Sequence, residues 1–334
     1  MDMPIEARDI SHAEALLAAG ELDAALPLLQ ELAAQVEAYA QQECQATDER
    51  QWFSFADTFE RLAYRRVERD PRSLTQLAVP FDRVYAALAF AHIARKEWEP
   101  ARDALMQAVR WNPMNCRYRL DLAELFGMLG NQQEWAALSA SVLDRAADAE
   151  PLARAYANLG HFFLQTDNVL AAEGCRRLAQ RLATGDAHAD TFIEQMGEEL
   201  PELAQEEERR VMGAVEEQGI ATSPSAEVAI CLLMCASDAA AAGDRNAATT
   251  YTLRARDLIG AEAAEALIRL IRTSDAELAQ ERAEATATGA AGAADAGTAD
   301  GVDASGGTCA AGDAAAEADE PGAGEPQMQD VKGE

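Results

Sequence analysis

The stretch that decides the fold is YANLGHFF, residues 156–163, with Ala172 nine residues beyond it. A Tyr, a Leu-Gly pair and a Phe stand at offsets zero, three, four and seven, so they share one face of a helix. A small residue such as Gly160 lets a second helix approach closely, while Phe163 fills the next gap. The spacing therefore predicts a helix that packs against another helix.

The same spacing occurs twice more, earlier in the chain. Ala89 and Ala123 stand where Gly160 stands in the quoted stretch, and each unit is about 34 to 37 residues long. Such a hairpin leaves an apolar face that only its neighbour can cover, so the units should stack. Helix pairs are expected at 81–94 with 97–111, 116–129 with 132–147, and 152–165 with 168–183.

These units resemble the tetratricopeptide repeat, and the best-matched repeats cover residues 81–185. The resemblance rests above all on Tyr156, Leu159, Gly160 and Phe163, followed by Ala172 and Ala179. Lys96 and Asp167 depart from the pattern, because a turn glycine is usual at their positions. The resemblance implies an all-α fold, an α-solenoid of tandem helical hairpins with a concave groove lined by the first helix of each.

The solenoid is expected over residues 8–284, with weaker flanking repeats at 10–42 and 225–258. Both flanking repeats place an alanine five residues beyond a turn glycine, Ala25 after Gly20 and Ala248 after Gly243. Residues 285–334 consist mainly of Ala, Gly, Asp and Glu, so they are expected to form a disordered acidic tail.

Two segments between the repeats have their own patterns. Residues 47–67 predict one long helix rich in aromatic residues, which ends at Asp70-Pro71. This helix is either packed between repeats or presents a hydrophobic docking face. Residues 190–218 predict two helices broken near Pro201, and no β-sheet is expected anywhere.

The composition excludes some classes of partner. With 58 acidic and 28 basic residues the formal charge is −30, which makes nucleic acid and anionic membrane surfaces poor partners. A basic, neutral or metal-bearing partner fits better, although the charge could also serve solubility alone. The absence of a membrane-length apolar run and of a targeting segment, together with cysteines in no framework spacing, favours the cytoplasm. The oligomeric state is not predicted.

No motif for catalysis or for a cofactor is recognisable, so we expect a protein that is not an enzyme and carries no cofactor or metal. Cys231 and Cys235 lie one helical turn apart, and buried packing is favoured over a metal-binding role for them. His92 occupies an aromatic position of its repeat and is expected in the core.

With no catalytic motif recognisable, the candidate functional feature is a binding surface on the repeats. An arginine recurs two residues before the first signature position of each best-matched repeat, as Arg83, Arg117 and Arg154. These guanidinium groups would suit an acidic peptide or a carboxylate terminus, or would pair with carboxylates of adjacent repeats. The resemblance places ten residues on the groove: Arg83, Phe90, Ile93, Arg117, Glu124, Met128, Arg154, Asn158, His161 and Gln165.

The resemblance therefore implies a non-catalytic scaffold or adaptor that binds a protein or peptide segment in its concave groove. The alternative is a ligand-responsive regulator, in which the helix array senses a small molecule or a signalling peptide. A peptide pool or metabolite pool that raises the thermal stability of the chain would distinguish the sensor.

Overall fold

Tandem helical hairpins make up most of the structure, a computed structural model that describes residues 3–182, 185–274, 277 and 280. Residues 285–334, where the acidic tail is expected, lie outside the described residues. The hairpins are α1 (Ala7–Ala18) with α2 (Leu22–Glu43), α4 (Phe81–Ala94) with α5 (Trp98–Trp111), α6 (Cys116–Met128) with α7 (Gln132–Leu143), α8 (Ala149–Gln165) with α9 (Val169–Leu182), and α12 (Ala226–Ala241) with α13 (Arg245–Ile259).

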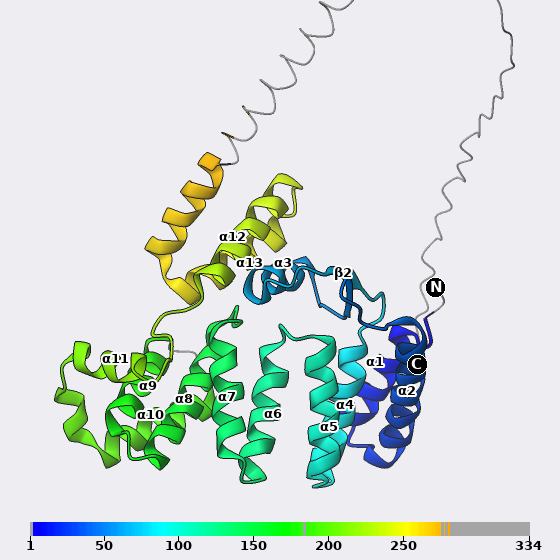
Figure 1. The fold of residues 1–334 in the computed structure, drawn as a ribbon, viewed down its shortest axis with the longest axis horizontal. Coiled ribbons are helices and arrows are strands. Elements are labelled where there is room, and N and C mark those ends of the chain that lie inside the picture. The colour runs from blue at the N-terminus through cyan, green and yellow to red at the C-terminus, as the bar shows by residue number, and fades with distance from the viewer. Residues whose placement is uncertain (1–2, 183–184, 275–276, 278–279, 281–334) are drawn as a thin grey trace, which may run out of the picture. The chain divides into compact units, whose positions relative to one another are not determined.

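The first four hairpins stack in chain order (Figure 1). The second helix of each packs on the first helix of the next, so α2 contacts α4, α5 contacts α6, and α7 contacts α8. Helix α10 (Ala187–Glu199) takes the next place, in contact with both α8 and α9. A 3-10 helix at Pro201–Gln205 and helix α11 (Glu208–Glu216) follow, and α11 packs on α9. The predicted all-α solenoid of hairpins is confirmed.

Each hairpin turns through a residue with positive φ. The N–H of the following residue donates to the carbonyl four positions before the turn residue, as Glu97 does to His92 at 2.9 Å and Asn168 does to Phe163 at 2.8 Å. This is the Schellman arrangement that ends many helices. The turn residues are Gly20 (φ 80°), Lys96 (62°), Gly130 (84°), Asp167 (58°) and Gly243 (81°). Lys96 and Asp167 thus adopt the glycine conformation without being glycine.

The glycine of the quoted stretch has a specific packing role. A Cβ atom on Gly160 would overlap the ring of Phe192 from α10. In the same way, a Cβ atom on Gly174 of α9 would overlap the side chain of Val215 from α11. The predicted close approach is therefore present, and it seats the pair of helices that continues the stack.

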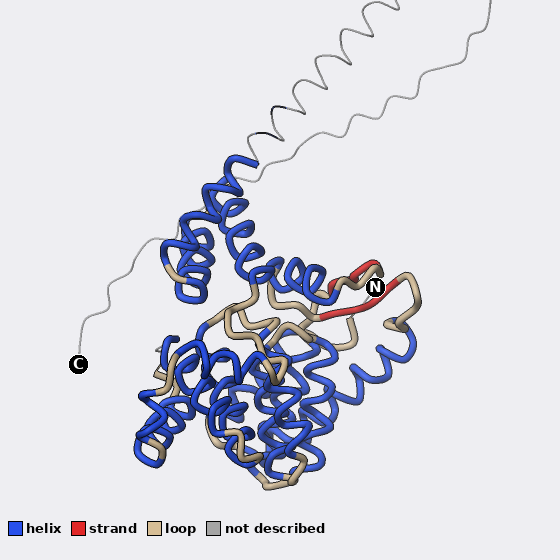
Figure 2. Tube along the Cα trace, turned by 60° about the vertical axis from the view of Figure 1, so that its left-hand side comes forward, coloured by secondary structure: helices blue, strands red, loops and turns tan. Residues whose placement is uncertain are grey.

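The predicted helix over residues 47–67 is wrong, and so is the expectation that no sheet would form. Strand β1 (Arg50–Phe53) pairs in parallel with β2 (Ser73–Gln76), and only α3 (Thr58–Glu68) is helical between them. Figure 2 shows the two strands in red. The insertion between α2 and α4 is a small module of its own, made of β1, α3 and β2.

Local hydrogen bonds explain the difference. The Asp57 side chain accepts from the N–H of Glu60 at 2.9 Å, so the helix begins at Thr58 and not before it. The N–H of Ser54 donates to the carbonyl of Trp111 at 2.8 Å, which fastens the end of β1 to the stack. The aromatic side chains are packed, not displayed: Phe53, Phe55, Phe59 and Tyr64 are all buried.

The α12–α13 hairpin forms where a flanking repeat is expected but does not continue the stack. It packs mainly on α3 of the insertion, with further contacts to α8 (Figure 1). Arg66 of α3 pairs with Glu227 at 3.1 Å, and Arg254 of α13 pairs with Asp148 at 2.7 Å. The helical residues 261–274 follow α13.

Candidate functional site

The first helices of the stack, α1, α4, α6 and α8, form what we call the first-helix wall. Two positions recur along it when residues are counted back from the turn residue of each hairpin. Six residues before the turn stand Glu14, Phe90, Glu124 and His161. Thirteen residues before the turn stand Arg83, Arg117 and Arg154.

The arginines of the wall pair with carboxylates of adjacent hairpins. Arg83 Nε donates to Glu14 Oε1 at 2.9 Å, and Arg154 Nε donates to Glu124 Oε1 at 2.9 Å. The hydrogen bond that Arg83 donates to Glu14 raises the pKa of Arg83 above its ordinary value. For Arg83 and Arg154 the structure therefore agrees with the second interpretation, in which carboxylates of neighbouring repeats neutralise the arginines.

These contacts form an ion-pair ladder with one incomplete step. At two steps, α1 to α4 and α6 to α8, a glutamate six residues before one turn meets the arginine of the next hairpin. At the step from α4 to α6 the glutamate position holds Phe90, and Arg117 instead lies 3.4 Å from Glu150. The Arg117 side chain is 69% exposed, whereas that of Arg154 is 22% exposed.

A hollow of about 330 Å³ opens next to this incomplete step, mainly between α1 and α4, with Tyr118 of α6 at its border. Its lining, the central hollow, consists of Glu14, Leu17, Ala18, Arg83, Ala86, Ala87, Phe90 and Tyr118. Small alanines beside large apolar residues create the space, and Phe90 remains 56% exposed. The hollow is large enough to accept one large apolar side chain.

A buried aspartate, Asp82, lies in the first turn of α4. Tyr118 donates to Asp82 Oδ2 at 3.2 Å, while Asp82 Oδ1 is buried without a hydrogen-bond partner. Burial raises the pKa of Asp82 to about 6 and also raises that of Glu60 in α3. Asn112 donates to Glu60 Oε2 at 2.8 Å, so this cluster joins the insertion to the stack.

The ten expected groove residues differ in exposure. Four are exposed: Phe90, Arg117, Met128 and Gln165. Five are half-buried: Arg83, Ile93, Glu124, Arg154 and His161. The expectation for Asn158 is wrong, because its amide is fully buried beneath α10, where it donates to Ser139 Oγ at 3.0 Å and meets His188 Nε2 at 2.7 Å.

Sequence reasoning missed part of the lining, most importantly Glu14, Leu17 and Tyr118. The resemblance that defines the groove covers only the best-matched repeats, and α1 precedes them. Counting back from Gly20 as from the other turn residues would have placed Glu14 at the position of Phe90 and Glu124. No comparable signal points to Tyr118, because its ring reaches the hollow through the packing of α6 on the earlier hairpins.

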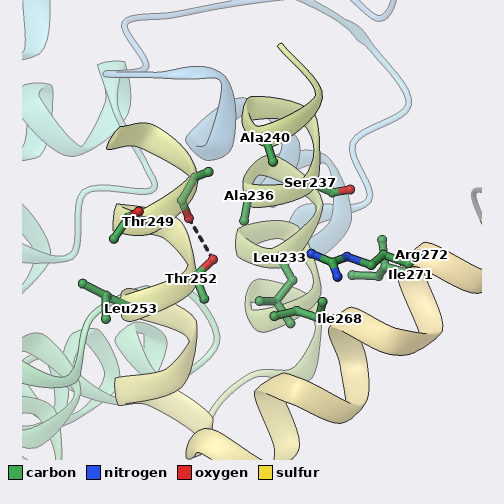
Figure 3. Close-up of a pocket in the computed structure, with 11 residues that line it drawn as sticks. Leu233, Ala236, Ser237, Ala240, Thr249, Thr252, Leu253, Ile268, Ile271 and Arg272 are labelled. Atoms are coloured by element: carbon green, nitrogen blue, oxygen red, sulfur yellow. Dashed lines mark hydrogen bonds between the residues drawn. The ribbon is translucent and has the colours of Figure 1, made fainter. Parts of the chain in front are cut away.

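A second hollow, of about 320 Å³, lies between α12, α13 and the helical residues 261–274 (Figure 3). Leu233, Ile268 and Ile271 line it, and Arg272 lies at its edge. The hydroxyls of Thr249 and Thr252 donate to carbonyls of their own helix, each at 2.8 Å. The polar groups of this hollow are thus largely used within α13 and do not converge on a ligand position.

The remaining candidate chemistry is structural. Cys231 and Cys235 are buried, and burial raises the pKa of each to about 11, which leaves them poor nucleophiles. Within the described part of the chain, no three His, Cys, Asp or Glu side chains are placed to hold a metal ion. Among the helices that are described, none is long and apolar enough to cross a membrane.

Comparisons with known proteins add little. No family model matches the chain, and no curated protein matches it. A solved structure from the functional characterisation of PilF of Pseudomonas aeruginosa aligns with 80% of this chain and 96% of that one, at 15% identity and a TM-score of 0.39. So loose a likeness carries no argument, and the fold class, an all-α solenoid of helical hairpins, rests on the helix contacts described above.

Proposed function

We propose that the chain is a non-catalytic scaffold that binds a segment of a partner protein along the first-helix wall. The observation that carries this proposal is the placement of exposed apolar side chains. Phe90 on α4 is 56% exposed and Met128 on α6 is 61% exposed, and the central hollow opens beside Phe90. Large apolar residues in such a setting typically mark sites for protein partners.

The architecture supports binding of an extended segment in particular. Stacked hairpins present their first helices side by side, so equivalent positions repeat along the wall. A partner segment can then contact Phe90 and Met128 together without any change in the stack. Binding by several small contacts of this kind needs no catalytic residue.

The test is selection of a random dodecapeptide display library on the purified full chain. Peptides enriched on the wild-type chain are then measured against a Phe90→Ala, Met128→Ala double variant. We expect the double variant to lose at least about tenfold in affinity, because truncating exposed interface anchors typically costs more than 1 kcal/mol each.

The control removes equally exposed apolar side chains elsewhere. Met106 on α5 is 49% exposed and Leu253 on α13 is 41% exposed, so Met106→Ala with Leu253→Ala is a matched pair. The proposal predicts unchanged binding for this control. Enriched peptides that bind the two double variants equally well would exclude the first-helix wall as the binding surface.

A further inference from the structure

The ion-pair ladder indicates which chemistry the wall lacks. At two of its steps, the arginine that stands thirteen residues before a turn contacts the glutamate that stands six residues before the preceding turn. These pairs are Arg83 with Glu14 and Arg154 with Glu124. Arg154 even gains a second carboxylate, because Asp121 lies 3.4 Å from its Nη2. The geometry of the stack therefore places a carboxylate site next to each of these arginines.

At the central step this site has no carboxylate of its own, because Phe90 occupies the equivalent position. Glu150 replaces it only loosely. Arg117 Nη2 lies 3.4 Å from Glu150 Oε1 and 3.5 Å from Oε2. The Arg117 side chain is 69% exposed and that of Glu150 is 52% exposed. An exposed pair of this kind contributes little, typically below about 1 kcal/mol, so an incoming carboxylate can replace Glu150 at small cost.

The apolar part of the site lies beside this arginine. Tyr118, the next residue along α6, lines the central hollow together with Phe90, Leu17 and Ala86. A ligand that fills the hollow with a large apolar side chain therefore brings its neighbouring residues close to the first turn of α6, where Arg117 is located. An apolar group and a carboxylate are the two features that the site can satisfy together.

The overall charge limits how acidic the partner can be. Residues 281–334 hold 12 of the 58 acidic and 2 of the 28 basic residues, so the rest of the chain carries 46 acidic and 26 basic residues and a formal charge of −20. This negative charge would repel a partner segment with a long run of acidic residues. A single carboxylate beside Arg117 interacts mainly with the charges close to it, because salt screens charges more than about 8 Å apart.

We propose that the central step of the wall recognises a partner segment in which a large apolar residue stands next to a single Asp or Glu. The apolar side chain occupies the central hollow, and the carboxylate pairs with Arg117, which completes the missing step of the ladder from outside. This inference rests on the proposed function and specifies the chemistry of its partner.

Two variants test it with the same random dodecapeptide library. Phe90→Glu supplies the missing carboxylate from within the chain, so it should abolish selection at the central step. Arg117→Glu reverses the charge, so it should enrich peptides with Lys or Arg, in place of Asp or Glu, beside the apolar residue. For one selected peptide, affinity should fall about tenfold with Arg117→Glu and recover when its acidic residue is replaced by Lys, as expected for a charge-assisted contact.

Arg210→Glu is the matched control, because Arg210 on α11 is 60% exposed and makes one surface pair, with Glu206. It changes the net charge equally and should leave the selected peptides unchanged. Wild-type selection of basic or uncharged neighbours, insensitive to Arg117→Glu, would overturn this inference and leave the scaffold proposal standing. Selection that does not depend on the first-helix wall at all would overturn both.

Discussion

At the scale of single residues, the stack depends on a few positions where the backbone or the packing admits little choice. Turn residues with positive φ end the first helix of each hairpin, and three of the five described above are glycine. L-residues pay a steric cost in this region that glycine does not. Lys96 and Asp167 therefore hold strained positions in an otherwise regular pattern.

Exchanging residues between turns tests this strain. Lys96→Gly should stabilise the chain by about 0.5 to 1 kcal/mol, because the relief of strain exceeds the extra freedom of glycine in the unfolded chain. Gly130→Ala should destabilise it by about 1 kcal/mol for the converse reason. Urea unfolding followed by circular dichroism measures both, and equal stabilities for all three chains would refute the role of the turn conformation.

Gly160 tests packing in the same way. Because an added Cβ would overlap the Phe192 ring, Gly160→Ala should destabilise the chain by about 1 to 3 kcal/mol, the usual cost of overpacking. The double variant Gly160→Ala, Phe192→Leu should recover part of this loss, since leucine lacks the ring that causes the overlap. If the change in unfolding free energy of the double variant equals the sum of the changes in the two single variants, the two residues are not coupled.

Asp82 provides a pH-dependent test. Burial raises its pKa from 3.8 to about 6, so the folded state holds the proton more tightly than the unfolded state. The protonated Asp82 therefore adds to the free energy of unfolding below about pH 4, and this contribution is lost as the pH rises through about 6.

The variant Asp82→Asn cannot ionise, so between pH 4 and pH 7.5 the wild-type chain should lose about 2 kcal/mol relative to it. The comparison removes the titration of Asp82, whereas Glu60, whose pKa is raised chiefly by its own burial, titrates in both chains. Parallel stability curves for the two chains over this range would show that Asp82 does not titrate with a raised pKa.

At the scale of the elements, the ladder links helices that are distant in sequence. Arg154→Gln should cost about 1 to 2 kcal/mol, because it leaves Glu124 and Asp121 close together without their cation on a partly buried surface. Arg117→Gln should change stability by less than about 0.5 kcal/mol, since its pair is exposed. Urea unfolding at 0.1 M and 1 M NaCl measures both, and the difference between the variants should shrink at high salt.

The same scale shows what the sequence could predict. The hairpins of residues 81–182 follow from helical periodicity and the spacing of small residues, since both are local properties. The strands of the insertion could not be found in this way. Residues 50–53 are two polar residues followed by two aromatic ones, which is not the alternation that predicts a strand. Their strand partner at 73–76 lies beyond a helix, so the pairing is a tertiary contact that no local pattern indicates.

The residues of the candidate site also differ in whether local sequence patterns could predict them. The recurring arginines and the exposed Phe90 and Met128 could be read from repeat positions alone. Asn158 could not be assigned correctly, because its burial depends on α10, whose place beside α8 no repeat spacing in the sequence indicates.

At the scale of the whole chain, the stack of hairpins is joined to the α12–α13 hairpin through the insertion. Arg254 of α13 is central to this junction, because its Nε lies 2.7 Å from Asp148 Oδ1 and its guanidinium lies 5.2 Å from the centre of the Phe59 ring. One side chain thus contacts both the loop before α8 and helix α3. Apolar contacts such as Phe59 with Tyr251 complete the junction, so the docking of α12–α13 should depend strongly on Arg254.

Arg254→Ala should therefore loosen α12–α13 while the stack stays intact. We expect amide hydrogen exchange to accelerate about tenfold or more in α12 and α13, because losing a paired, partly desolvated arginine costs more than 1 kcal/mol of local stability, and to stay unchanged in α6 to α8. Arg256→Ala is the control, since Arg256 pairs with its exposed neighbour Asp257 and should alter neither region. Equal exchange in the two variants would mean that apolar packing on α3 holds the hairpin without Arg254, and faster exchange in α6 to α8 would mean that the stack itself depends on this junction.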